Sequence, residues 1–200
     1  MLNEKQIERM LRKLKRFETT LEPYIFKKVD EINMAMYQTG RNLNQIPDDS
    51  LFSSVSKGET WGGEGNYCWF KGQFKVDKKL KGKTLYIRPD VGGYEAMLWV
   101  NGMPFGTFAT KIVVTRHGNH YCNMIKQNVE EGEIIDIALE YYAGHYVMGC
   151  MPFEENPKNS YIFEYKGIDI CVKNEDVTDF LFDLKTFNQM ASVLDKNSFV

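Results

Sequence analysis

The chain has 200 residues, of which 43% are hydrophobic and 26% charged, a composition typical of a globular protein with its own core. The formal net charge of −2 provides no basic field, so we expect neither nucleic acid nor an anionic membrane as a partner. Residues 1–14 are amphipathic and lack the apolar centre of a secretion signal, and no apolar run could span a bilayer. We therefore expect a cytoplasmic protein whose cysteines stay reduced: Cys68, Cys122, Cys150 and Cys171.

Apolar residues recur at helical spacing in two successive segments at the start of the chain. The first segment contains Ile7, Met10, Leu11, Leu14, Phe17 and Leu21. The second begins after Pro23, ends near Gly40, and contains Ile25, Val29, Ile32 and Met36. These patterns predict an N-terminal helical extension over residues 1–40. The polar, turn-rich residues 41–60 are predicted to be a connector with little regular structure.

From Trp61 the apolar period changes to two, which is typical of strands with one buried face. The period continues through about eight short segments, with turn signals between them, up to residue 173. Asn101-Gly102 is the clearest of these turns, because both residues tolerate positive φ, and it predicts a hairpin between residues 96–100 and 103–108. In that hairpin we expect the even-numbered residues of the first strand to face the interior and Met97 and Trp99 to face the other way.

The predicted fold class is mainly β: an antiparallel jelly-roll or galactose-binding-like sandwich over residues 61–173, flanked by helices at both ends. The C-terminal segment 174–200 again has helical spacing, with Asn174 as a candidate N-cap. Its apolar stripe comprises Val177, Leu181, Leu184, Phe187, Ala191 and Leu194.

Residues capable of metal or acid–base chemistry are few. His117, His120 and Cys122 form the one short-spaced group of metal ligands, but a zinc site needs three or four converging ligands, so we favour a turn and strand here. Asp136 and Glu140 fall on the polar face of a predicted strand, where solvated charges are expected. We predict no catalytic residue, metal or cofactor in this chain, and a zinc enzyme built on the histidines remains the least favoured alternative.

Aromatic side chains make up 14% of the chain and could offer stacking faces to sugar rings. The candidates for such contacts are Trp61, Trp69, Trp99, Tyr94, Tyr141, Tyr142 and Tyr146. A two-layered β fold also needs bulky residues for its core, so packing is the more common role for any one of them. An independent carbohydrate-binding module is therefore kept as an alternative function.

Several motifs, taken in order, resemble the N-terminal β-sandwich domain of glycoside hydrolase family 38 α-mannosidases of the cytosolic type. W-G-G-E-G-N-Y-C-W-F-K-G-Q-F-K-V (Trp61–Val76) is similar to the opening strand of that domain. The other motifs are L-Y-I-R (Leu85–Arg88), E-A-M-L-W-V-N-G-M-P-F-G (Glu95–Gly106), I-A-L-E-Y-Y-A-G (Ile137–Gly144) and I-D-I-C-V-K-N-E-D-V-T-D-F-L-F-D-L (Ile168–Leu184). His145 and Met148 depart from the pattern, because relatives tend to carry Asn and Phe there.

The resemblance implies that catalysis and accessory functions belong to separate domains. The family holds its nucleophilic Asp and its zinc, or another divalent metal, in a following catalytic domain, so residues 174–200 would lead into a domain absent from this chain. The chain itself would be a non-catalytic accessory domain that frames the active site or an oligomer interface. The implied partners are the enzyme's own catalytic domain, a second copy of the chain and a mannoside ligand. With His145 added by the resemblance, the carbohydrate contacts that we expect are Trp61, Tyr94, His145 and Tyr146.

Overall fold

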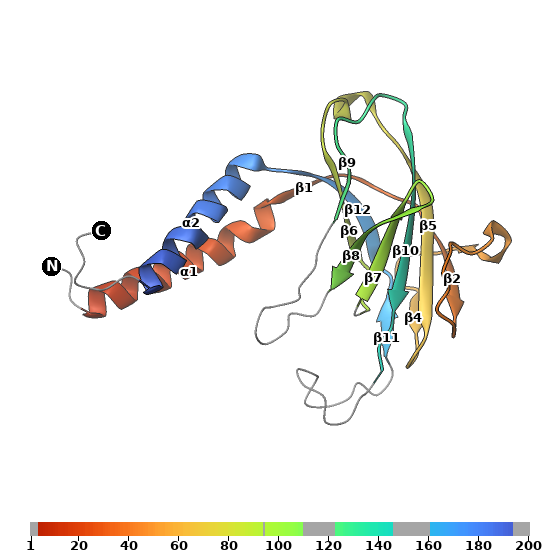
Figure 1. The fold of residues 1–200 in the computed structure, drawn as a ribbon, viewed down its shortest axis with the longest axis horizontal. Helices are drawn as coiled ribbons and strands as arrows, with labels where there is room; N and C mark the ends of the chain where they lie inside the picture. The colour runs from red at the N-terminus through yellow and green to blue at the C-terminus, as the bar shows by residue number, and fades with distance from the viewer. Residues whose placement is uncertain (1–3, 94, 110–122, 146–160, 194–200) are drawn as a thin grey trace. The chain divides into compact units, whose positions relative to one another are not determined.

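The computed structural model describes residues 4–93, 95–109, 123–145 and 161–193. The chain divides into two compact units. One unit combines both chain ends, up to Lys27 and from Val172 onward, and the other is the continuous segment Lys28–Cys171. The first unit is helical and the second is a β-sandwich, as Figure 1 shows.

The helical unit is a pair of antiparallel helices, α1 (Glu4–Leu21) and α2 (Glu175–Val193), which lie side by side (Figure 1). The backbone N–H of Val177 donates to the Asn174 side chain at 3.4 Å, so Asn174 is the N-cap of α2, as predicted. Neither helix is long and apolar enough to span a membrane.

The sandwich consists of antiparallel sheets whose strands come from both halves of the chain. A four-stranded sheet has the order β1 (Phe26–Glu31), β12 (Gly167–Lys173), β6 (Leu85–Asp90) and β9 (Met124–Lys126). A six-stranded sheet has the order β3 (Ser53–Ser54), β2 (Ala35–Thr39), β5 (Tyr67–Lys75), β10 (Ile134–Tyr142), β7 (Glu95–Val100) and β8 (Met103–Ala109). A two-stranded pair joins β4 (Thr60–Gly62) to β11 (Ile162–Glu164). The predicted fold class, an antiparallel sandwich with helices at both ends, is confirmed.

The predicted hairpin lies between β7 and β8, closed by Asn101 and Gly102 with φ values of 50° and 78°. These left-handed conformations match a tight turn whose twist suits the flanking strands. Asn101 also fixes the turn on the neighbouring strand β10, because its side chain accepts a hydrogen bond from the Asp136 N–H at 2.9 Å. The predicted faces of β7 are confirmed, since Ala96, Leu98 and Val100 are buried.

The core lies between the sheets and is built from the alternate residues of each central strand. On β10 the core face consists of Ile135, Ile137, Leu139 and Tyr141, all buried, as the period of two predicts, and Ala138 of the other face is buried as well. Phe70 of β5 stacks on Tyr165 with ring centroids 5.5 Å apart, so aromatic rings from both ends of the domain meet in this core. Apolar burial of this kind supplies most of the stability of a β domain.

The second N-terminal helix predicted from residues 25–36 is wrong, because these residues form β1 and β2. The Ile32 N–H donates to the Ile168 carbonyl and the Asn174 N–H donates to the Ile25 carbonyl, so β1 pairs with β12. Ile32 is buried against β5. Pairing with a distant strand therefore outweighs the local helical spacing. The sheets thus begin well before residue 61. Within the predicted strand span 61–173, residues 94, 110–122 and 146–160 lie outside the described residues.

Candidate functional site

The outward-facing side of the six-stranded sheet gathers aromatic and acidic side chains from three adjacent strands. Trp69 of β5 lies directly opposite Glu140 of β10, and Tyr67 lies opposite Tyr142. Trp99 of β7 is opposite Ala138 on the other side of β10. Since alternate residues share a face, Tyr67, Trp69, Trp99, Glu140 and Tyr142 all project from the same surface. We call these five residues the outer aromatic face.

The rings of this face pack in two pairs. The centroids of Trp69 and Trp99 lie 5.9 Å apart, and those of Tyr67 and Tyr142 lie 4.9 Å apart. Trp69 is fully buried and forms the floor, whereas the other three rings are half-buried and reach the surface. The Nε1 atoms of both indoles are buried and find no hydrogen-bond partner among the described residues. The face therefore combines aromatic surface with polar groups whose hydrogen-bonding capacity is incompletely used.

Glu140 is the acidic member of the outer aromatic face. Desolvation by its neighbours raises the pKa of this carboxyl, and a hydrogen bond from the Leu43 backbone N–H, 3.4 Å from Oε1, partly opposes that rise. Sequence reasoning placed Glu140 among solvated charges. The structure corrects this, because the side chain is partly shielded and held by the segment that follows β2.

Glu140→Gln is expected to stabilise the chain slightly at neutral pH. The folded-state pKa of Glu140 lies above its ordinary value of 4.5, so the folded state favours the neutral carboxyl and pays a penalty once the group is ionised. Glutamine cannot ionise, so the penalty disappears, and its side-chain oxygen can still accept the hydrogen bond from the Leu43 N–H. We expect a gain below about 1 kcal/mol at pH 7 that disappears as the pH falls below the unfolded-state value.

Urea unfolding of the wild type and the variant at pH 7 and at pH 4 measures this difference. Asp136→Asn, on the same face of β10, is the matched control, because this exposed carboxylate accepts a hydrogen bond from Gln73 and we expect no gain from its removal. A variant that is less stable than the wild type at pH 7 would contradict the account.

Tyr142 and His145 form the exposed border of the face. The Tyr142 hydroxyl is hydrogen-bonded to Nδ1 of His145, and the two rings meet edge to face with centroids 5.9 Å apart. Desolvation raises the pKa of the Tyr142 phenol, so the hydroxyl stays protonated at neutral pH. A neutral phenol beside an imidazole offers both a donor and an acceptor at the edge of an aromatic surface.

The four residues predicted to contact carbohydrate have different positions. Trp61 is only 1% exposed, and its indole N–H donates to the Val91 carbonyl at 2.7 Å inside the core, so it presents no ring face to a ligand. His145 is exposed at the border of the outer aromatic face. Tyr94 and Tyr146 lie outside the described residues.

The sequence did not single out Tyr67, whereas Trp69, Trp99 and Tyr142 were already among the aromatic candidates for a sugar contact. The period of two along β5 places Tyr67 and Trp69 on the face opposite the core residues Cys68 and Phe70, which was the available signal. Their pairing with Glu140 and Tyr142 depends on the register between β5 and β10, which a single sequence does not specify.

The described carboxyl groups of this surface project in one direction. Glu95 is the nearest acidic residue to Glu140 on the same sheet surface among the described residues. The two are diagonal neighbours on β7 and β10, and ordinary sheet geometry separates such residues by about 7–8 Å. Glycoside hydrolysis needs two carboxyl groups on opposite sides of the scissile bond. Glu95 and Glu140 project from one sheet in the same direction, so both would reach a bound sugar from the same side.

The thiols and histidines give no alternative centre within the described part of the chain. Cys68 and Cys171 are free and buried, and desolvation raises the pKa of both thiols, which opposes formation of a nucleophilic thiolate. No group of three potential metal ligands occurs among the described residues. The predicted group His117, His120 and Cys122 lies outside them.

Among known proteins, the chain has low-identity matches to solved structures. No family model matches it, and no curated protein matches it. A β-glucuronidase from Ruminococcus gnavus in complex with D-glucuronic acid matches with 8% identity and a TM-score of 0.47 over 74% of this chain and 29% of that chain. The same enzyme in complex with uronic deoxynojirimycin gives 10% identity and a TM-score of 0.45, again over 74% of this chain and 29% of that chain.

A β-glucuronidase from glycoside hydrolase family 2 matches with 19% identity and a TM-score of 0.38, over 55% of this chain and 13% of that chain. The chain therefore spans less than a third of each of these enzymes. The resemblance to family 38 α-mannosidases is wrong: no family model or curated protein supports it, and the solved structures that match are described as β-glucuronidases, one of them from family 2. The motifs behind that resemblance coincide with strands of the sandwich and, for Ile168–Leu184, with β12 and the start of α2.

Proposed function

We propose that this chain is a non-catalytic accessory domain of a carbohydrate-active enzyme, and that it contacts saccharide through the outer aromatic face. The single observation that carries the proposal is the arrangement of two ring pairs around a shielded carboxyl on one sheet surface. Binding sites of small ligands combine apolar and aromatic surface with a few placed polar groups, and this face has that composition.

Each part of the face has a role in this proposal. The half-buried rings of Tyr67, Tyr142 and Trp99 offer amphipathic surface to the C–H side of a pyranose ring. His145 and the Tyr142 hydroxyl offer hydrogen bonds to sugar hydroxyl groups. Trp69 supports the rings from below, since it is fully buried beside Trp99.

Fluorescence titration of the purified chain tests saccharide contact. We expect tryptophan emission to change on addition of at least one of the methyl glycosides of glucose, galactose and mannose, or of D-glucuronic acid, at millimolar concentration, because the half-buried Trp99 is part of the face. Tyr142→Ala should abolish the change, whereas Tyr24→Ala, in the helical unit and 63% exposed, should leave it intact. The absence of any response with all four sugars would refute saccharide contact.

A hydrolysis assay tests the non-catalytic part of the proposal separately. We expect the chain alone to release no nitrophenol from the α- and β-nitrophenyl glycosides of the same sugars. Turnover that is lost in both Glu95→Gln and Glu140→Gln would overturn this part, because it would make the two carboxylates a catalytic pair.

We also propose that the protein works in the cytoplasm. The support is that both described cysteines, Cys68 and Cys171, are free thiols enclosed in the sandwich. Expression of a tagged copy followed by cell fractionation tests this, and recovery outside the cytoplasmic fraction would contradict it.

A further inference from the structure

One edge of the helix pair is apolar. Phe17 of α1 and Phe180 of α2 meet edge to face with ring centroids 5.6 Å apart. Residues seven apart occupy the same side of a helix two turns away. Because the helices are antiparallel, Met10 of α1 and Phe187 of α2 lie along the same edge, two turns beyond the Phe17–Phe180 contact. Met190 follows Phe187 by three residues and extends this edge.

This apolar edge, defined as Met10, Phe17, Phe180, Phe187 and Met190, is open in the described chain. The five side chains are respectively 50%, 48%, 47%, 66% and 46% exposed. A two-helix unit normally buries its large apolar residues against a third element. A contiguous row of this kind on a surface marks an interaction site.

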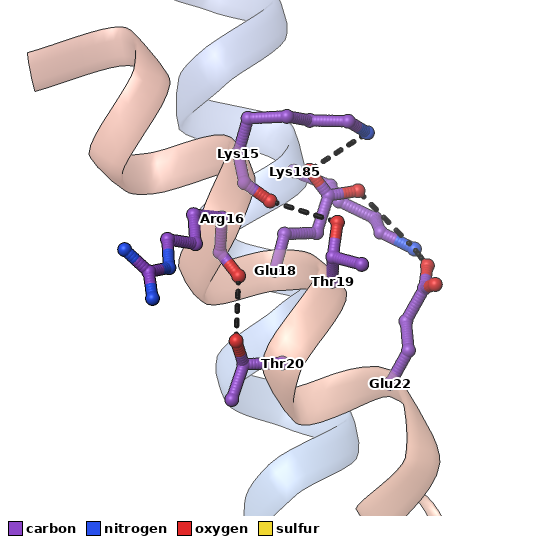
Figure 2. A network of polar contacts seen from close by, with 7 residues as sticks. All are labelled: Lys15, Arg16, Glu18, Thr19, Thr20, Glu22 and Lys185. Atoms are coloured by element: carbon purple, nitrogen blue, oxygen red, sulfur yellow. Dashed lines mark hydrogen bonds and ion pairs between the residues drawn. The ribbon is translucent and has the colours of Figure 1, made fainter. Parts of the chain in front are cut away.

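The opposite edge of the helix pair is polar and already occupied. Lys185 of α2 forms ion pairs with Glu18 and Glu22 of α1, at 3.6 Å and 3.0 Å, and Lys15 pairs with Glu18 at 3.4 Å (Figure 2). Glu18 is 9% exposed within this network. The two edges therefore differ: the polar edge forms ion pairs within the chain, whereas the apolar edge leaves its large side chains exposed.

The charges of the two helices are complementary. α1 carries six basic and three acidic side chains, whereas α2 carries four acidic and one basic. Lys13 lies between Met10 and Phe17 on the apolar edge, and Asp183 lies between Phe180 and Phe187, by the same three- and four-residue spacing. A surface with this pattern is complementary to itself after a two-fold rotation that places α1 against α2.

We propose that the apolar edge docks a second copy of this chain, so that two helix pairs form a four-helix bundle around a two-fold axis parallel to the helices. In this arrangement α1 of one copy faces α2 of the other, which places Lys13 near Asp183 of the second copy. A two-fold axis perpendicular to the helices would instead set basic α1 against basic α1, which like-charge repulsion disfavours. The bundle buries both apolar edges together, as short-looped helical bundles do.

Size-exclusion chromatography coupled to light scattering measures the molar mass of the chain in solution and so tests for the dimer. We expect a mass twice the 23.3 kDa of the chain at about 50 µM, in the concentration range of ordinary homodimers. Phe187→Ser should raise the dissociation constant at least about 100-fold, since each dimer loses two buried rings. Phe182→Ser is the matched control, because this 71% exposed ring of α2 lies away from the apolar edge and its loss should leave the dimer intact.

Circular dichroism of each variant confirms that the helices remain folded, so that dissociation is separated from unfolding. A wild-type chain that stays monomeric at about 100 µM, or a Phe182→Ser variant as weak as Phe187→Ser, would overturn the proposal.

Charge reversal tests the orientation of the axis. Lys13→Glu and Asp183→Lys alone should each weaken the dimer by roughly 10-fold, and the double variant should recover to within about 3-fold of the wild type. A double variant that is weaker than both single variants would contradict the pairing of α1 with α2 of the second copy.

Discussion

Trp61→Ala is expected to lower the free energy of unfolding of the sandwich by about 3–5 kcal/mol, the usual cost of deleting a fully buried large ring. Trp61 packs among Phe70, Tyr141 and Phe163, with centroid separations of 5.8, 5.8 and 5.2 Å. Its N–H also holds the Val91 carbonyl, and alanine leaves that acceptor without its donor. This loss is a large fraction of the total stability of a domain of this size.

Urea unfolding followed by far-ultraviolet circular dichroism measures the effect of Trp61→Ala. Met103→Ala is the control, because Met103 is 67% exposed on β8 and its truncation should change the free energy of unfolding by less than about 0.5 kcal/mol. A loss below about 1 kcal/mol for Trp61→Ala would mean that the ring is not the centre of the core.

Gly72→Ala is expected to cost up to about 3 kcal/mol for a different reason, the absence of space. A Cβ at this position of β5 would lie 2.6 Å from the carbonyl oxygen of Asn33 and 2.9 Å from Cγ2 of Ile32. The first of these atoms belongs to the backbone between β1 and β2 and cannot rotate away. The substitution must therefore displace the crossing that carries the chain from one sheet to the other.

Gly40→Ala is the matched control for Gly72→Ala. Gly40 also lies outside the left-handed region, and an added Cβ would meet only the Asn66 side chain, at an ordinary 3.6 Å. We expect a change within about 0.5 kcal/mol there, in parallel thermal and urea unfolding. Equal stability losses for the two variants would show that the close approach at Gly72 does not constrain the fold.

The strands that sequence reasoning predicted correctly are those with a local signal. Ile135 to Tyr141 alternates strictly between apolar and polar residues, apart from Ala138, and the buried face follows that alternation. Asn101-Gly102 specifies its own turn through two residues that tolerate positive φ. In both cases the residues that determine the local structure lie within a few positions of it in the sequence.

Residues 25–36 show where local patterns fail. Their apolar spacing suits a helix as well as a buried strand, and the segment is too short for periodicity to decide between them. The decision comes from β12, which pairs with β1 from the other end of the chain through the Ile32–Ile168 and Ile25–Asn174 hydrogen bonds. The sequence alone does not reveal a partner so distant.

The candidate site depends on contacts of the same distant kind. Glu140 accepts a hydrogen bond from the Leu43 N–H, 97 positions away, and its surroundings desolvate a carboxyl that was expected to be solvated. His145 was expected among the sugar contacts, but its link to Tyr142 becomes visible only in the structure. Trp61 was also expected to contact sugar but is buried in the core. Aromatic character alone does not tell a core ring from a ring that contacts a ligand.

The most direct test of the outer aromatic face uses the three tryptophans as reporters. In a ¹⁵N-labelled chain titrated with the four sugars, the account predicts that the indole N–H signals of Trp69 and Trp99 shift with at least one sugar. The Trp61 signal should stay in place, because its N–H is bonded to Val91 inside the core. Three unmoved signals throughout the titrations, or a shift confined to Trp61, would contradict contact at this face.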